Sequence, residues 1–128
     1  MYDRSLAQDS LLNIKEALTT ISERMVPVRS VDDFLLSPEG MLRLDAICMN
    51  LIALGEAVKG LDKITKGELL ASHPEIYWSG IMRMRDKIAH HYFEIDAEVV
   101  FSTLQADIPP LLPVIEKMFT EVSQGGML

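Results

Sequence analysis

Several features that define common protein classes are missing from this sequence. It holds a single cysteine, Cys48, which excludes an internal disulfide framework. Its three histidines show no His-x3-His spacing and no Cys pair accompanies them, which argues against a dedicated zinc site. No run of about 18 apolar residues is present and the N-terminus lacks a signal-peptide core, so we expect no membrane span and no secretion. Together these absences predict a cytoplasmic protein.

Positive charge is also scarce. The chain carries 12 basic and 19 acidic residues, a net charge of −7. General affinity for RNA or DNA rests on clustered Lys and Arg, so the composition counts against a general nucleic-acid-binding protein. It does not exclude a small ribonuclease cleft, because Arg83, Arg85 and Lys87 lie together and a local positive patch steers phosphates even on an acidic protein. The acidity also suits docking to a basic partner.

What is present is a helical pattern. A chain of 128 residues that is 48% hydrophobic has the size of one domain with a real core. Apolar residues recur every three or four positions over residues 4–25, which predicts an amphipathic helix ended by Pro27. Ser37-Pro38 predicts the start of a second long helix, expected to run to about Val58 with Gly60 as its stop.

The second half of the chain is expected to hold two further main helices. Residues 65–68 fit a capping box for one short helical segment. His73-Pro74 is expected to begin the next helix, which ends near His90 or His91. Asp96 is expected to cap the last helical region, which three prolines would kink or divide.

The architecture follows from these elements. The sequence predicts an all-α fold, an antiparallel up-down bundle of four main helices with one or two short helices. We expect a single domain over residues 1–128, with a frayed C-terminal tail at about 122–128 that contains Gly125-Gly126.

Residues 81–92, Ile-Met-Arg-Met-Arg-Asp-Lys-Ile-Ala-His-His-Tyr, hold the candidate chemistry. On a helix of about 100° per residue, Arg85 falls inside the apolar stripe. A guanidinium cannot lose its charge and is costly to bury unpaired, so Arg85 is expected either to line a polar cleft or to meet an anion. His90 lies about 140° from Arg85 on a regular helix. The two side chains converge only if the helix ends near Ala89 or if a second subunit completes the site.

Two acidic residues are candidates to support this site. Asp86 lies four residues before His90 and is expected either to orient the imidazole or to stay a solvated charge. Gly55 costs about 1 kcal/mol relative to Ala inside a helix, which suggests that another helix approaches closely there. Glu56 is then expected either to pair with Arg85 or to remain solvated. By spacing alone, a structural role for Arg85 and His90 is favoured over a catalytic one.

A family resemblance changes this balance. Residues Arg85 to Tyr92 resemble the Arg-(four residues)-His-x-Tyr motif of HepT-like toxins, in the HEPN superfamily of helical ribonucleases. Residues 50–57 are similar to the Gly-Glu-Ala helix of that family, and Tyr77-Trp78 and residues 93–96 are similar to its segments beside the motif. The resemblance spans nearly the whole chain.

The resemblance implies a HEPN-like fold, a twofold homodimer and an endoribonuclease that needs no metal and no cofactor. RNA carries its own nucleophile, the 2′-hydroxyl, so Arg85 would hold the phosphate and His90 would carry protons. The family usually has Asn after the arginine, where this chain has Asp86. The resemblance also implies neutralisation by an MntA-like nucleotidyltransferase antitoxin, which moves AMP from ATP onto Tyr92.

Three functions compete at this point. The first is a metal-independent endoribonuclease toxin of a toxin–antitoxin pair. The second is a catalytically silent helical binding subunit that is the substrate and partner of a nucleotidyltransferase. The third, a stand-alone structural bundle, explains neither Arg85 on an apolar face nor the position of Tyr92. Toxicity that is lost in Arg85→Ala or His90→Ala would favour the enzyme.

Overall fold

The structure is a computed structural model that describes residues 2–124, and these residues form helices and no strand. The elements, in chain order, are α1 (Arg4–Met25), α2 (Asp32–Leu35), α3 (Pro38–Ile64), α4 (Glu68–Ala71), α5 (Trp78–His90), the 3-10 helix η1 (Tyr92–Glu94), α6 (Ala97–Ala106) and α7 (Leu111–Gln124).

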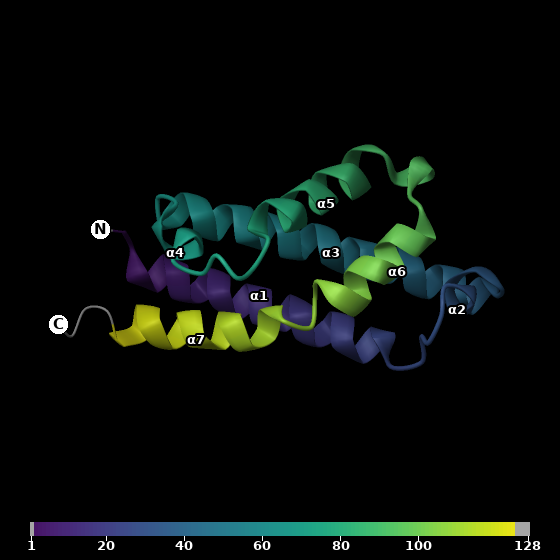
Figure 1. Ribbon diagram of the computed structural model, residues 1–128, viewed down its shortest axis with the longest axis horizontal. Helices are drawn as coiled ribbons and strands as arrows, with labels where there is room; N and C mark the ends of the chain where they lie inside the picture. Colours follow the sequence, from purple (N-terminus) through teal and green to yellow (C-terminus); the bar gives the residue numbers. More distant parts are fainter. Residues whose placement is uncertain (1, 125–128) are drawn as a thin grey trace.

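The long helices α1 and α3 run antiparallel and form the centre of the bundle (Figure 1). Helix α5 packs on α3 and helix α7 packs on α1, each antiparallel to its neighbour. Helix α6 runs obliquely over α3 and α1 in the view of Figure 1, and an edge-to-face contact between Phe34 of α2 and Phe101 of α6 joins it to α2. The predicted all-α up-down bundle is confirmed.

The predicted starts of α1 at residue 4, of α3 at Pro38 and of α6 after Asp96 are confirmed, and a side chain caps each of these helices. Asp3 caps α1 by accepting a hydrogen bond from the Leu6 amide, and Ser37 caps α3 by accepting one from the Gly40 amide. Asp96 caps α6 in the same way. These side chains satisfy amide groups that a helix start leaves without partners.

Two predicted boundaries are wrong. Helix α3 does not stop at Gly60 but continues to Ile64, because the added turn buries Leu61 completely. Beyond Ile64 the chain turns away at Lys66 and Gly67, which both have positive φ angles. The capping box predicted for residues 65–68 does not form, since the Thr65 hydroxyl donates to the Leu61 carbonyl of α3.

The motif helix also starts later than predicted. Helix α5 begins at Trp78 and not at Pro74, because tertiary contacts hold the preceding turn. His73 is buried with Nε2 2.6 Å from a carboxylate oxygen of Glu121 on α7. The Trp78 indole donates to the His73 carbonyl at 2.9 Å. Trp78 is therefore a buried anchor at the start of the motif helix.

The last helical region divides at its prolines. Helix α6 ends at Ala106 and α7 begins at Leu111, with two of the three prolines between them. The expected fraying from residue 122 is wrong for the described part, because Val122 is buried and Arg4 donates to the Val122 and Ser123 carbonyls. The rest of that expected tail, residues 125–128, lies outside the described residues.

Candidate active site

Helices α3 and α5 approach closely at Gly55. A Cβ atom added to Gly55 would lie 2.2 Å from Arg85 Cβ and 2.8 Å from Arg85 Cγ. Such distances leave no room for any side chain at position 55, so the predicted role of this glycine is confirmed. The missing side chain lets the stem of Arg85 lie directly against α3.

The guanidinium of Arg85 meets two carboxylates. Its Nε lies 2.5 Å from Glu56 Oε1, and its Nη1 donates to Asp86 Oδ1 at 3.0 Å. The Nε atom is buried, and the contact with Glu56 is an ion pair without the alignment of a hydrogen bond. Of the predicted alternatives, Arg85 meets anions and Glu56 pairs with Arg85.

Asp86 is held by basic groups on both sides. Its Oδ1 accepts a hydrogen bond from Lys59 Nζ of α3 at 2.6 Å, in addition to the bond from Arg85. The hydrogen bond from Lys59, followed by the one from Arg85, holds the pKa of the Asp86 carboxyl below its ordinary value. No hydrogen bond joins Asp86 to His90 in the described part of the chain. Asp86 therefore directs its charge toward α3 and Arg85.

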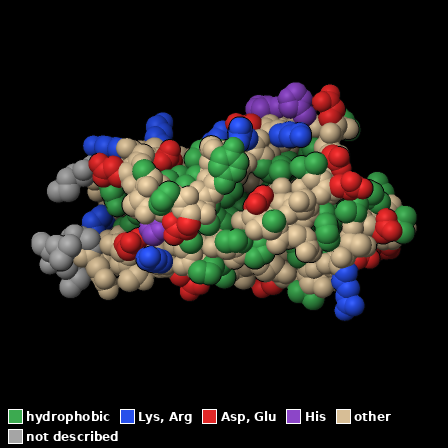
Figure 2. Space-filling model, viewed as in Figure 1, with side chains coloured by type: hydrophobic (Ala, Val, Ile, Leu, Met, Phe, Trp, Pro, Cys, Tyr) green, Lys and Arg blue, Asp and Glu red, His purple; other side chains and the backbone are tan. Residues whose placement is uncertain are grey.

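His90 is the last residue of α5 and is exposed. The helix continues regularly through Ala89, so it does not open between Arg85 and His90. Figure 2 shows histidine and basic side chains together along the edge of the molecule where α5 runs. A regular helix places positions 85 and 90 about 140° apart, so one chain alone does not bring the two side chains together.

Tyr92 lies beyond the motif helix. It belongs to η1, so a helical projection from Arg85 does not describe its position. Its hydroxyl donates a hydrogen bond to a carboxylate oxygen of Asp45 on α3. Its ring meets the ring of Phe93 edge-on, with centroids 5.9 Å apart, and Phe93 is fully exposed. Tyr92 is thus exposed in part, beside the outer face of α3.

Two residues around the site were missed from the sequence, Lys59 and Asp45. The signal for them is helical register. Asp45, Glu56 and Lys59 are separated by eleven and three residues, so all three lie on one face of α3. That face meets Arg85, Asp86 and the Tyr92 hydroxyl.

Two further observations bear on the chemistry. Among residues 2–124, no three His, Cys, Asp or Glu side chains are grouped so that they could share a metal ion. In the same span no helix is both long and apolar enough to cross a membrane.

The thiol of Cys48 is buried. Burial, followed by the charge of Asp45, raises the pKa of this thiol to about 11, so it stays protonated at neutral pH.

Comparison with known proteins places the chain in a family. The pattern that defines the family described as "Ribonuclease HepT-like" matches residues 14–118. The chain belongs to the ribonuclease HepT-like family. The predicted resemblance to the HepT-like family is therefore confirmed. The match includes the two helices, α3 and α5, that build the candidate site.

Relatives of this HepT-like chain are similar over most of their length. A protein named "Probable ribonuclease HepT" from Thermococcus cleftensis is 35% identical over 111 residues, which cover 87% of this chain and 94% of the relative. A "Putative RNase" from Methanocaldococcus jannaschii is 27% identical over 93% of this chain and 88% of its own length. Another from Caldanaerobacter subterraneus is 34% identical over 74% of this chain and 75% of its own. No solved structure matches the chain.

Proposed function

We propose that this HepT-like chain is a metal-independent endoribonuclease, the toxin of a toxin–antitoxin pair. Membership of the family and the names of the relatives support a ribonuclease. The observation that carries the finer proposal is the state of Arg85: a guanidinium with a buried Nε, ion-paired with the exposed Glu56 of α3 and hydrogen-bonded to Asp86 of its own helix. Such a group is a ready binding site for a phosphate.

The phosphate enters by replacing Glu56. The Glu56 side chain is 54% exposed, so it turns into solvent without leaving a buried charge behind. Arg85 then holds the scissile phosphate and the charge that grows on its oxygens. The 2′-hydroxyl oxygen attacks the phosphorus and the bond to the 5′-oxygen breaks. His90 of one copy takes the hydroxyl proton, and His90 of a second copy gives a proton to the leaving oxygen. The products are a 2′,3′-cyclic phosphate and a 5′-hydroxyl.

A homodimer completes the site in this proposal. Arg85 faces α3 whereas His90 is exposed at the end of α5, so a second copy is needed to bring the two kinds of group to one phosphate. The outer face of α3 exposes Leu42 and Met49 on either side of Asp45, next to the exposed Phe93. An apolar surface of this kind, beside the motif, suits a self-complementary twofold interface.

Tyr92 is the proposed point of neutralisation. A partner nucleotidyltransferase, MntA-like, binds ATP, and the Tyr92 oxygen attacks its α-phosphorus while pyrophosphate leaves. Asp45 is placed to accept the proton of the hydroxyl, because that hydroxyl already donates to its carboxylate. The AMP group adds a negative charge and a base beside the motif, which excludes RNA by repulsion and by occlusion.

The test is cleavage of RNA by the purified chain. We expect cleavage by the wild type with and without EDTA, and a loss of about 10²–10⁴-fold in His90→Ala, because a proton carrier is removed. Arg85→Ala is expected to be equally inactive. His91→Ala is the matched control, since His91 is the adjacent exposed imidazole and lies outside the motif register. Undiminished cleavage by a folded His90→Ala variant would refute the assignment, and cleavage that disappears in EDTA would show a metal-dependent reaction.

One observation favours the second function, a silent binding subunit that only receives AMP. Arg85 is paired with Glu56 and also with Asp86, which stands where the family usually has Asn. Both carboxylates compete with a phosphate. A wild type that accepts AMP on Tyr92 but cleaves no RNA, together with Asp86→Asn that cleaves, would establish this second function for the natural chain.

A further inference from the structure

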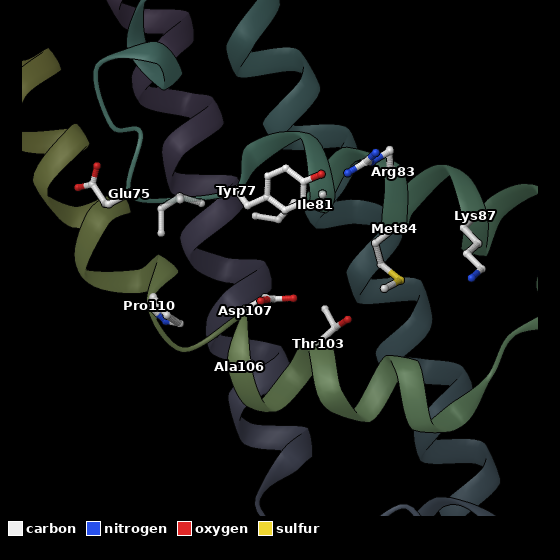
Figure 3. Close-up of a pocket in the computed structure, with 12 residues that line it drawn as sticks. Glu75, Tyr77, Ile81, Arg83, Met84, Lys87, Thr103, Ala106, Asp107 and Pro110 are labelled. Atoms are coloured by element: carbon white, nitrogen blue, oxygen red, sulfur yellow. The ribbon is translucent and has the colours of Figure 1, made fainter.

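A groove lies between α5 and α6, on a side of α5 that Arg85 does not reach. Its volume is about 450 Å³. Figure 3 shows Tyr77, Arg83 and Lys87 on the side of α5, and Thr103 and Asp107 on the facing side of α6. Positions 83 and 85 are about 200° apart on a helix, which separates this groove from the carboxylate pair around Arg85. The groove is therefore a second candidate site.

Tyr77 presents its ring at the groove in a defined position. The residue is 67% exposed although its ring contacts α5. Gly80 leaves the space for this ring, since a Cβ at position 80 would lie 2.5 Å from Tyr77 Cδ2. The guanidinium carbon of Arg83 lies 5.2 Å from the centre of the ring. An exposed aromatic ring whose position is fixed by its contacts with α5 is a surface on which a nucleic-acid base stacks.

Positive charge leads from the groove to the active-site histidine. Arg83, Lys87 and His90 are separated by four and three residues, so they follow one face of α5. Among residues 2–124, Arg83 and Lys87 form no ion pair with a carboxylate. The acidic Glu75 lies at the opposite end of the groove (Figure 3). The basic end of the groove is thus the end that faces the motif.

The α6 side of the groove offers hydrogen-bond acceptors. The Thr103 hydroxyl donates to the Val99 carbonyl at 3.0 Å, so only its lone pairs remain for a ligand. The Asp107 carboxylate is exposed, and its side chain makes no hydrogen bond within the described part of the chain. Acceptors in this position complement a base that carries an exocyclic amino group.

We propose that this groove binds an unpaired base of single-stranded RNA. The base stacks on Tyr77 in place of the Arg83 guanidinium, which turns from the ring toward an adjoining phosphate beside Lys87, and the amino group of the base donates to Asp107. The strand then follows α5 toward His90, which lies about 10 Å from Arg83 along the helix axis. The groove is a subsite for the strand that is cleaved, so this inference rests on the ribonuclease function proposed above.

Binding is tested with an oligomer that the enzyme cannot cut. Fluorescently labelled 2′-O-methyl oligocytidine lacks the attacking hydroxyl, and its binding is followed by fluorescence anisotropy. Tyr77→Leu is expected to weaken binding roughly 5- to 150-fold, the range found when a stacking aromatic is removed. Tyr77→Phe keeps the ring and is expected to bind as the wild type does. Lys15→Gln, an exposed lysine of α1, is the control for loss of a positive charge.

Two further variants separate stacking from charge. Gly80→Ala retains Tyr77 but displaces its ring, so it is expected to bind more weakly than the wild type while Tyr77→Phe does not. Lys87→Gln is expected to reduce the slope of log K against log salt by about 0.7, the value for one phosphate contact on a single strand. An unchanged slope would remove Lys87 from the subsite.

The choice of base is tested with two pyrimidines of equal size. Cytosine carries an amino group at the position where uracil carries a carbonyl, so the wild type is expected to bind oligocytidine more tightly than oligouridine. Asp107→Asn is expected to reduce this preference. Equal affinity of the wild type for the two oligomers would show that Asp107 does not contact the base.

The outcomes for this subsite and for the proposed ribonuclease function are distinct. Wild-type affinity in both Tyr77→Leu and Gly80→Ala, or no measurable binding by the wild type, would overturn the subsite, whatever the cleavage assay shows. Binding that depends on Tyr77 in a protein that cuts no unmodified RNA would keep the subsite and overturn the ribonuclease function. Circular dichroism of each variant checks that the helices are intact.

Discussion

The close approach of α3 and α5 at Gly55 predicts a large effect from the smallest substitution, Gly55→Ala. The added Cβ would lie 2.2 Å from Arg85 Cβ, whereas carbon atoms in contact are about 3.5–4.0 Å apart. The two helices must therefore separate by roughly 1.5 Å at this point. Overpacking of this kind costs about 1–3 kcal/mol in the free energy of unfolding.

The same helix provides a matched control. Gly60 also lies inside α3, but a Cβ at position 60 meets nothing within 4 Å. Both substitutions gain about 1 kcal/mol because Ala is a better helix former than Gly. Gly60→Ala is therefore expected to stabilise the protein, and the difference between the two variants isolates the overlap at Gly55. We expect the Tm of Gly55→Ala to lie about 4–12 °C below that of Gly60→Ala.

The activity of the two variants should separate as well. Gly55→Ala moves the stem of Arg85 away from α3, and a displacement of about 1 Å at a binding group costs about 100-fold in rate. Gly60→Ala is expected to cleave RNA as the wild type does. The measurements are thermal unfolding by circular dichroism and RNA cleavage under single-turnover conditions. Equal melting temperatures and equal cleavage by the two variants would refute the claim that Gly55 holds Arg85 in place.

Three other predictions concern the surface around the motif. Met49→Glu places a charge in the exposed apolar face of α3, so analytical ultracentrifugation should show a monomer for this variant and a dimer for the wild type. A wild type that is monomeric at micromolar concentration would contradict the proposed interface. Asp45→Asn keeps an acceptor for the Tyr92 hydroxyl but takes no proton, so intact-mass measurements should show AMP transfer slowed by about 10²-fold or more, and an unchanged rate would exclude Asp45 as the base. The pKa of Asp86 is held below its ordinary value of 3.8, so the stability that its carboxylate contributes is present at neutral pH and is lost as the pH falls through the lowered pKa. The urea midpoints of the wild type and of Asp86→Asn should therefore differ at pH 7 and converge in acid. A difference that stays constant with pH would contradict this.

Local signals explain which parts of the fold could be predicted from the sequence. The starts of α3 and α6 depend on a capping side chain within three residues, so Ser37 and Asp96 predict them, whereas the apolar periodicity over residues 4–25 predicts α1. The end of α3 and the start of α5 depend on burial by distant helices. Leu61 extends α3 because it enters the core, and His73 holds the turn before α5 because Glu121 lies 48 residues away in the sequence.

The candidate site divides in the same way. The register of Gly55 and Glu56 against Arg85 could be anticipated, because a helix that lacks a side chain at one position invites a neighbour there. The partner of Asp86 could not be anticipated, because Lys59 lies 27 residues away on another helix and only the packing of α5 on α3 brings the two together. The position of Tyr92 could not be predicted either, because it depends on where α5 ends and not on helical spacing.

The pairing of α1 with α7 has a consequence for the order in which the protein folds during synthesis. Arg4 Nε donates to the Val122 carbonyl at 2.8 Å, a contact across 118 positions of the chain. Helices α1 and α3 can pair as soon as both have left the ribosome, but the other side of α1 stays uncovered until the last helix has been made. A chain that stops short of α7 exposes that apolar side and becomes a target for proteases and aggregation.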